Sequence, residues 1–321
     1  MRKRRVLIAG GGVSGLLCSY VFRRKRKCEV YVLEPKTLGG EFLAGGLKYI
    51  HHTDEMVDLF DELDIQYSNY SIRGGIMLRG TVHPYPACFQ GMAAEDAQRI
   101  QGDHYRKTRR SEPGTESKTA MNDPASTKPK NTLRCHFPDM IKALSRRAHV
   151  ITAGLTKVEK NMAHLTDGRS LPYDHLVLTI PLWIIKECVR FFVPHGMAMK
   201  LNIARVKASR DRYAKWDYVY TPYTPADAIH RFSPSANDYV VEVNGDLDRN
   251  KLDSDLNFIF PEGWSLVELK EGLKGHLLPL KNEAAWPANV APLGRFAKWD
   301  PRATMDVTLM DVYALHERWF G

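Results

Sequence analysis

The stretch VLIAGGGVSGLL, residues 6–17, decides the fold of this chain. Its first four residues are apolar and predict a short buried strand over 6–9, which three consecutive glycines then interrupt. Apolar residues at helical spacing predict a helix over about 13–24, and a second apolar run predicts a strand over 29–33. This order of strand, glycine turn, helix and strand is typical of an α/β protein with a parallel sheet.

The glycines of this turn have the spacing of a dinucleotide-binding site. Gly10, Gly12 and Gly15 match the pattern GxGxxG. Gly10 permits the tight turn, Gly12 allows the backbone to approach a pyrophosphate, and Gly15 lets the helix pack closely on the strand. A glycine-rich turn without any ligand has the same composition, so the spacing alone is weak evidence.

The surroundings of the turn strengthen the prediction of a nucleotide site. The helix is expected to begin at Val13 and Ser14, and the free amides of its first turn attract phosphate groups. Glu34 ends the second strand about twenty residues after the last glycine, where a carboxylate accepts hydrogen bonds from ribose hydroxyls.

Composition sets the class of protein. The chain has 321 residues, of which 44% are hydrophobic and 26% charged, values that exclude disordered and collagen-like proteins. The five cysteines are scattered without a CxxC pair, which disfavours a disulfide framework or a zinc site and favours the reducing cytoplasm. No apolar run is long enough to span a membrane. The net charge of +9 favours polyanionic partners but names none of them.

A second glycine turn, Gly39-Gly40, follows Glu34 closely. This run resembles the start of the FAD-binding amine-oxidase and UDP-galactopyranose mutase superfamily, in which a Gly-Gly turn lies beneath the flavin. The resemblance implies FAD as the cofactor. It also implies a Rossmann-like FAD-binding domain of the glutathione-reductase type with an inserted substrate domain of antiparallel sheet and helices.

The segment GLKYIHHT, residues 46–53, is similar to the Gly-Pro-His-Ile-Phe-His-Thr segment of the mutases. Lys48 replaces the first histidine of that segment and His51 matches the second. In the family this segment lies beside the reactive face of the flavin, so the resemblance makes Lys48, His51 and His52 candidates for positioning water or transferring protons. The alternative is a set of polar residues on a loop. Lys48 argues that the substrate or the chemistry differs from the sugar-ring contraction of the mutases.

Two later segments resemble the same superfamily. Residues 173–181 are similar to its closing strand, D-x-V-I-x-T-x-P, and LGRFAKW, residues 293–299, is similar to its carboxy-terminal flavin motif. The resemblance implies that Gly294 and Arg295 contact the cofactor. It implies the same for Met305, in a helix that begins near Thr304 and directs its amino terminus at the flavin N1 and C2 carbonyl. The alternative is a surface arginine and an ordinary terminal helix.

The remaining segments are expected to form the substrate-facing domain. Strands are predicted over 217–220 and 238–243, a hairpin over 73–86, and a helix over 54–63 with Thr53 as its cap. A second hairpin over 155–172 is expected to turn at Asp167-Gly168. The predicted FAD-binding domain comprises 1–53, 133–182 and 290–321, and the predicted substrate domain comprises 54–132 and 183–289.

Two features of the substrate domain suggest anionic ligands. The segment Ile229-His230-Arg231-Phe232-Ser233 looks like the superfamily strand that carries an arginine near the substrate, so Arg231 is a candidate for holding a carboxylate or phosphate. A surface arginine is the alternative. Residues 98–131 form a basic stretch that lacks large apolar residues, which predicts a solvated linker, a lid or an arm that contacts phosphates.

The flavin that the resemblance implies would oxidise a C–N bond. The sequence shows no second dinucleotide-binding motif and no CxxC pair, so dioxygen is the expected electron acceptor. The stretches FLAGGLKYIHHT, residues 42–53, and IRGGIMLRGTVHPYP, residues 72–86, look more narrowly like the FAD-dependent lyases of bacteriophage thymidine hypermodification. That likeness implies a glycine-modified thymidine in DNA as substrate, 5-aminomethyl-deoxyuridine as product and the host cytoplasm as location. An oxidase of a free small amine, a mutase of nucleotide sugars and a non-catalytic FAD-bearing protein remain alternatives.

Overall fold

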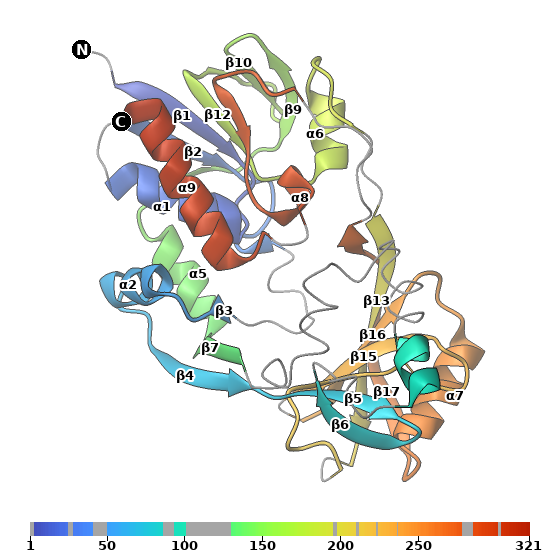
Figure 1. The fold of residues 1–321 in the computed structure, drawn as a ribbon. Helices are drawn as coiled ribbons and strands as arrows, with labels where there is room; N and C mark the ends of the chain where they lie inside the picture. Colours follow the sequence, from blue (N-terminus) through green and yellow to red (C-terminus); the bar gives the residue numbers. More distant parts are fainter. Residues whose placement is uncertain are drawn as a thin grey trace.

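The computed structural model describes residues 3–24, 28–40, 50–85, 93–100, 130–194, 198–209, 212–222, 224–235, 237–277, 285–300 and 303–321. Figure 1 shows two bodies: an upper one, in which helices cover a parallel sheet, and a lower one built on a larger sheet. The two ends of the described chain lie near each other at the top of the upper body, where the Arg4 guanidinium donates to the Trp319 carbonyl at 2.8 Å. No described helix is both long and apolar enough to cross a membrane.

The upper body is centred on a five-stranded sheet whose neighbouring strands are all parallel. Its order is β18 (Val290–Pro292), β12 (His175–Leu178), β1 (Arg4–Ala9), β2 (Cys28–Leu33) and β8 (His149–Ile151). The sequence therefore predicted the two amino-terminal strands correctly, because short runs of branched apolar residues suit a sheet that is covered on both faces.

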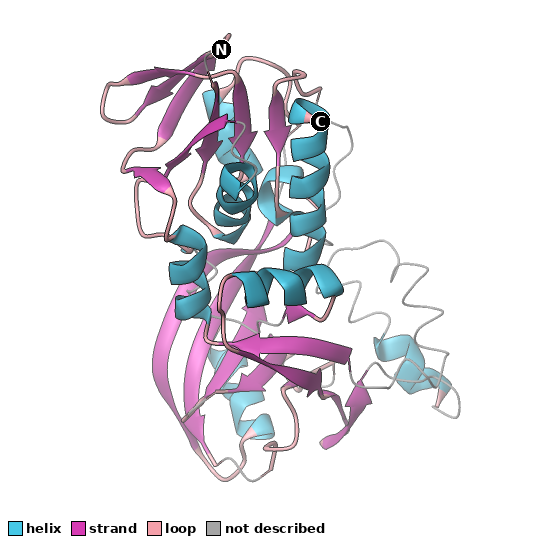
Figure 2. Cartoon of the chain, turned by 90° about the vertical axis from the view of Figure 1, so that its left-hand side faces the viewer, coloured by secondary structure: helices cyan, strands magenta, loops and turns pink. Residues whose placement is uncertain are grey.

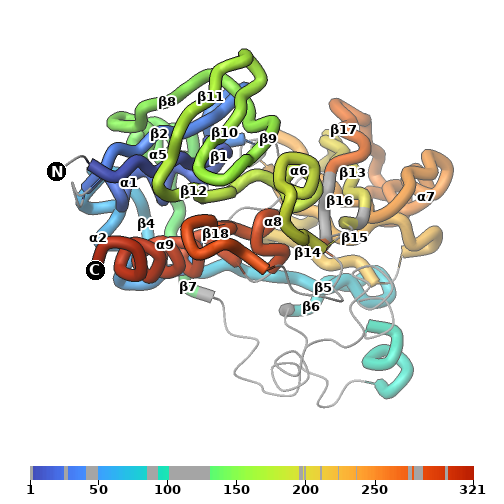
Figure 3. Tube along the Cα trace, turned by 90° about the horizontal axis from the view of Figure 1, so that it is seen from above, coloured from blue at the N-terminus to red at the C-terminus, as the bar shows by residue number. Residues whose placement is uncertain are grey.

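Alternate residues of β1 face two different layers. Val6 and Ile8 belong to an apolar cluster with helices on one face, whereas Leu7 and Ala9 belong to a cluster on the other face. The helices are α1 (Val13–Arg24), α5 (Phe137–Ser145) and α9 (Met305–Phe320), which Figure 3 labels. Figure 2 shows helices beside the strands of this body. The opposite layer contains α6 (Leu182–Cys188), the short α8 (Arg295–Lys298) and a three-stranded sheet. The helix predicted over 13–24 is confirmed.

The three-stranded sheet corrects one prediction. The segment 155–172 forms three strands, β9 (Leu155–Glu159), β10 (Met162–Leu165) and β11 (Ser170–Pro172), instead of a single hairpin. The predicted turn at Asp167-Gly168 joins the second and third strands, and Gly168 has a φ of 84°. The additional turn contains Lys160 at a φ of 47° and lacks the glycine signal on which the prediction relied.

The lower body is built on a seven-stranded sheet. Its strands are antiparallel except for the parallel pair β14 and β5. Their order is β17 (Trp264–Leu277), β13 (Ala198–Ala208), β16 (Tyr239–Asn244), β15 (Ile229–Pro234), β14 (Tyr218–Tyr220), β5 (Gly74–Leu78) and β6 (Thr81–Tyr85). Helix α7 (Arg249–Ile259) packs on this sheet through buried Leu252 and Leu256.

A small sheet of β3 (Ile50–His51), β7 (Lys130–Cys135) and β4 (Tyr67–Ile72) lies beside α5 and below α9 (Figure 1). Helix α2 (Asp54–Glu62) begins after Thr53, whose side chain accepts a hydrogen bond from the Met56 amide at 3.3 Å, as expected. Apolar residues of α2 join the same cluster as α1 and α9. Of the basic stretch 98–131, residues 98–100 are helical and 130–131 belong to β7, whereas 101–129 lie outside the described residues.

Candidate functional site

The glycine turn after β1 is held together by contacts that side chains would disrupt. Gly10 has a φ of 109°, and a β-carbon on Gly15 would lie 1.9 Å from the Gly10 carbonyl oxygen. The Thr179 hydroxyl, which follows β12, donates to the carbonyls of Ala9 at 2.9 Å and Gly10 at 3.0 Å. The first and last glycines of the motif therefore serve the packing of the strand, turn and helix.

The middle glycine faces open space. A β-carbon on Gly12 would meet no protein atom within 4 Å. Gly12 directly precedes α1, which has no acidic residue in its first turn, and the amides of Val13, Ser14 and Gly15 lie in that turn. First-turn amides lack intrahelical carbonyl partners and carry partial positive charge. This end of the helix suits an anionic group.

Glu34 lies beside the same turn. One carboxylate oxygen accepts the Gly11 amide at 2.8 Å and the other accepts the Lys36 amide at 2.9 Å. Each carboxylate oxygen has capacity for a further hydrogen bond. The carboxylate is thus fixed by the backbone and can still accept from hydroxyl groups such as those of a ribose.

The second glycine turn packs directly against the first. Gly39 forms a parallel bridge with Gly12, and the Gly39 amide donates to the Gly11 carbonyl at 2.9 Å. Gly40 has a φ of 54°, and its β-carbon would lie 3.7 Å from the Cα of Gly12. The structure therefore brings together the two glycine segments that the sequence had placed at one site.

The carboxy-terminal motif reaches the same place. Gly294 has a φ of 81°, and a β-carbon there would lie 2.2 Å from the hydroxyl oxygen of Ser14 in α1. Arg295, the first residue of α8, is exposed, and Met305 begins α9 as expected. The contact between Gly294 and Ser14 joins the two ends of the chain at the glycine turn.

The candidate histidines have different environments. The Nδ1 atom of His51 lies 3.2 Å from the Oδ1 atom of Asp306 in the first turn of α9. His52 is exposed, and its backbone amide donates to the Asn131 carbonyl at 3.4 Å. Lys48 lies outside the described residues.

Arg231 lies in the seven-stranded sheet and has an acidic partner there. Its Nε and Nη2 atoms donate to the two carboxylate oxygens of Glu242 at 2.8 and 2.9 Å. The Glu242 side chain is only 4% exposed, whereas that of Arg231 is 28% exposed. This ion pair gives Arg231 a structural function, and contact with a substrate anion stays a prediction.

Two of the described cysteines have thiols of raised pKa. The four cysteines that the structure describes are free. Burial raises the pKa of Cys28 to about 11 and that of Cys135 to about 11. Their thiols therefore stay protonated at neutral pH, and the thiolate is the reactive form.

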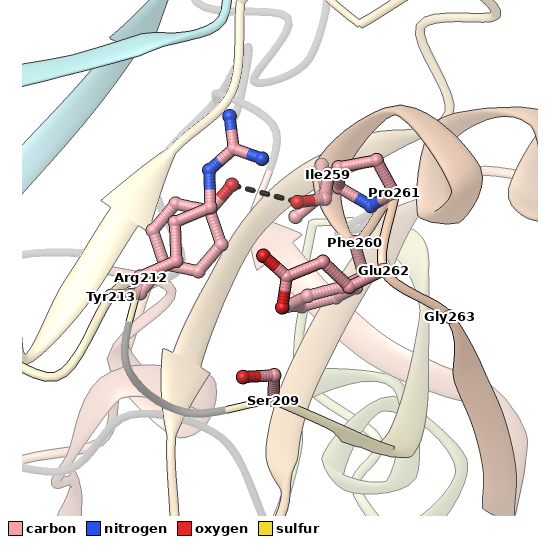
Figure 4. Close-up of a pocket in the computed structure, with 8 residues that line it drawn as sticks. All are labelled: Ser209, Arg212, Tyr213, Ile259, Phe260, Pro261, Glu262 and Gly263. Carbon is pink, nitrogen blue, oxygen red and sulfur yellow. Dashed lines mark hydrogen bonds between the residues drawn. The ribbon is translucent and has the colours of Figure 1, made fainter.

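A hollow in the lower body is too small for a substrate. It has a volume of about 10 Å³, room for about one water molecule. Figure 4 shows its walls, in which the Tyr213 hydroxyl donates to the Ile259 carbonyl at 2.7 Å. The lining residues are Ser209, Arg212, Tyr213, Ile259, Phe260, Pro261, Glu262 and Gly263.

The glycine turn fits the dinucleotide part of FAD. The open face of Gly12 and the helix start suit a pyrophosphate, and Glu34 suits a ribose. At the start of α9 the Thr304 hydroxyl is buried without a hydrogen-bond partner among the described residues, so it is available to form a hydrogen bond with a bound group.

Sequence reasoning missed three residues that shape these sites. Thr179 holds the glycine turn, Glu242 engages Arg231, and Asp306 contacts His51. Thr179 lies in the segment 173–181 and Asp306 in the helix that begins near Thr304, both of which the sequence analysis had identified. No local sequence pattern, however, indicates which residues they contact. An acid in the first turn of a helix is common for electrostatic reasons alone, so it does not by itself reveal a contact.

No family model matches this chain, and no curated protein matches it. Among solved structures, a reduced UDP-galactopyranose mutase is similar, with 13% identity, a TM-score of 0.71, and coverage of 99% of this chain and 94% of the other. Cyclohexylamine oxidase from Brevibacterium oxydans has 10% identity, a TM-score of 0.68, and coverage of 99% and 100%. Wild-type putrescine oxidase bound to putrescine has 10% identity, a TM-score of 0.62, and coverage of 98% and 99%. Over nearly its whole length, the chain shares the fold of these proteins.

Proposed function

We propose that this chain is an FAD-dependent oxidoreductase of the amine-oxidase type that cleaves the C–N bond of an amino-acid-like substrate. The observation that carries the proposal is the open face of Gly12, a residue that forms a bridge with Gly39 and directly precedes α1. The fold supports it, because two proteins of similar fold are named as oxidases of putrescine and of cyclohexylamine.

Several residues would hold the cofactor. The amides of Val13 and Ser14 would bind its pyrophosphate, and Glu34 would accept from its ribose. Gly40, Gly294, Arg295 and Met305 would surround the flavin, as the sequence resemblance implies. FAD, when bound, supplies the two-electron oxidation of a carbon next to nitrogen, and dioxygen would finally accept the electrons.

The chain's own residues would prepare the substrate. A protonated amine cannot lose hydride readily, because its nitrogen has no electron pair to stabilise the cation that forms. A base must therefore remove a proton first, and His51 and His52 are the described candidates, together with Lys48 from the sequence. Arg231 is the candidate that would orient an anionic group of the substrate.

The narrower proposal names glycine-modified thymidine in phage DNA. Oxidation of the glycine Cα–N bond followed by addition of water would give 5-aminomethyl-deoxyuridine and release glyoxylate, with two electrons and a proton passing to FAD. The sequence resemblance and the net charge of +9 support this substrate. A free amino-acid derivative is the simpler alternative, since it needs the same oxidation without DNA.

The mutase-like alternative is supported by one comparison, the structural likeness to a UDP-galactopyranose mutase. A mutase differs from an amine oxidase in its redox balance, because a mutase returns its flavin to the starting state in every turnover. An oxidase of amines transfers electrons out of the substrate.

An absorbance experiment separates these functions. The purified protein, with FAD bound, is mixed without oxygen with an oligonucleotide that carries the glycine-modified thymine, and in parallel with N-benzylglycine. Loss of the oxidised flavin band with the oligonucleotide, and peroxide release in air, supports the DNA substrate. Loss of this band with N-benzylglycine but not with the oligonucleotide supports a free amine as the substrate. Turnover of a UDP-sugar only after dithionite treatment supports the mutase, and a protein that binds no FAD refutes the proposal.

A further inference from the structure

His51 and Asp306 meet where the short strand β3 contacts the beginning of α9. Their Nδ1 and Oδ1 atoms are 3.2 Å apart, and their side chains are 33% and 15% exposed. The Oδ1 atom of Asp306 is buried and forms no hydrogen bond within the described part of the chain, and catalytic hydrogen bonds often align only once substrate binds. Figure 1 shows this point at the lower end of α9, on the side of the upper body that faces the seven-stranded sheet.

The chemistry of the two groups fixes which imidazole nitrogen can act as a base. A neutral imidazole carries one proton, on either Nδ1 or Nε2. An ionised carboxylate can only accept, so a carboxylate beside Nδ1 favours the tautomer in which Nδ1 carries the proton. Nε2 then has the free electron pair. The buried aspartate of a serine protease orients its histidine by the same principle.

The position of Asp306 on α9 stabilises its carboxylate and fixes it beside His51. It lies in the first turn, where the partial positive charge of the helix end stabilises a carboxylate. The helix behind it is anchored by buried Leu309 and Val312. Five residues further along α9, Asp311 forms an ion pair with Lys298 of α8 at 2.7 Å.

We propose that Asp306 is a positioning residue for His51, which it holds as the Nδ1–H tautomer with Nε2 as the proton acceptor. The proposal rests on the proposed oxidation of an amine. In the step that it serves, an N–H bond of the substrate ammonium breaks and the proton passes to Nε2. The electron pair stays on the substrate nitrogen, and the Asp306 carboxylate faces the resulting imidazolium and stabilises it.

The tautomer is measured by ¹⁵N NMR of the full chain with labelled histidine, in which the His51 signals are identified by their loss in His51→Gln. In the wild type, the His51 spectrum at high pH is expected to show a protonated Nδ1. In Asp306→Ala the two tautomers are expected to mix towards Nε2–H, while Asp306→Glu keeps the wild-type pattern. Asp311→Ala is the matched control, because it removes an α9 carboxylate that does not contact His51.

The proton transfer is tested by the rate of flavin reduction under anaerobic conditions. Asp306→Ala is expected to lower the limiting rate about 10–100-fold, less than the about 10²–10⁴-fold of a whole general base because His51 itself remains, with little change in the substrate concentration for half-saturation. Asp306→Glu is expected to recover most of the loss, and Asp311→Ala to behave like the wild type.

The outcomes separate this inference from the proposed function. An unchanged His51 spectrum in Asp306→Ala overturns the positioning, whatever the substrate is. A changed spectrum with an unchanged reduction rate overturns the part of His51 in proton transfer. If the spectrum changes and no amine reduces the flavin, the positioning stands and the proposed oxidation fails.

Discussion

Substitutions at Gly15 and Gly12, two glycines of the same motif, are expected to impair different properties: the first the stability of the fold, the second the affinity for FAD. A β-carbon on Gly15 would lie 1.9 Å from a backbone carbonyl oxygen, so these atoms must separate by about 1 Å before Gly15→Ala can fold. A β-carbon on Gly12 would meet nothing within 4 Å. Gly12→Val should therefore fold normally and place its methyl groups where the pyrophosphate is expected.

The magnitudes follow from this geometry. Overpacking against rigid backbone costs about 3 kcal/mol, so Gly15→Ala should lower the Tm of flavin-free protein by about 6 °C, at about 2 °C per kcal/mol for a chain of this size. Gly12→Val should change the free energy of unfolding by less than about 0.5 kcal/mol. Its affinity for FAD should fall at least about 100-fold, which corresponds to about 2.7 kcal/mol of lost binding free energy.

The assay compares thermal unfolding of both flavin-free variants with their FAD affinity by titration. Gly12→Ala is the milder control, with normal stability and a smaller loss of affinity. If Gly12→Val unfolds as early as Gly15→Ala, the open face of the turn is not a ligand site. If it is stable and still binds FAD like the wild type, the cofactor lies elsewhere.

Three further predictions test other parts of the molecule. Glu34→Gln should lower FAD affinity about tenfold in a calorimetric titration, because an amide cannot accept from both backbone amides and the ribose; unchanged affinity would contradict this. Arg231→Met should lower the free energy of unfolding by about 3 kcal/mol in urea, because the buried Glu242 loses its partner. The further change Glu242→Leu should restore stability without restoring any loss of substrate affinity. His175 stacks on Trp319. Burial lowers the pKa of His175 below its usual 6.5, and a neighbouring arginine makes a smaller contribution in the same direction. The unfolded chain therefore takes up this proton before the folded one, and stability should fall as the pH drops below about 6.5. His175→Gln should reduce that slope between pH 7.5 and 5.5, and an equal slope in both proteins would refute the assignment.

The part of the fold that sequence alone predicted is the part that local rules determine. The helix from Val13 to Arg24 has the expected bounds, because glycines precede it and apolar spacing continues through it. Helix α2 begins after Thr53 for a similarly local reason, since a threonine oxygen can cap a helix. The proximity of Gly39 to Gly12 was expected only through resemblance, and the bridge between them bears it out.

The rest depends on contacts between distant segments. The ion pair of Arg231 and Glu242 follows from the antiparallel register of β15 and β16, in which these two residues are paired. Both strands were expected, but residues 234–238, PSAND, lie between them without the two-residue Asn-Gly or Asp-Gly turn that would fix their register. Lys160 adopts a left-handed conformation without being a glycine, so the additional turn of the three-stranded sheet had no visible marker.

The charged residues at the start of α9 change what this helix end can stabilise. The resemblance implies that the amino terminus of this helix stabilises negative charge on reduced flavin. A helix end contributes about half a positive charge, whereas Asp306 in its first turn contributes a full negative charge. A proton on His51, 3.2 Å away, would offset the charge of Asp306 and make this helix end more favourable to an anion. Proton uptake by His51 would then serve both the amine, which must lose a proton, and the flavin, which gains negative charge.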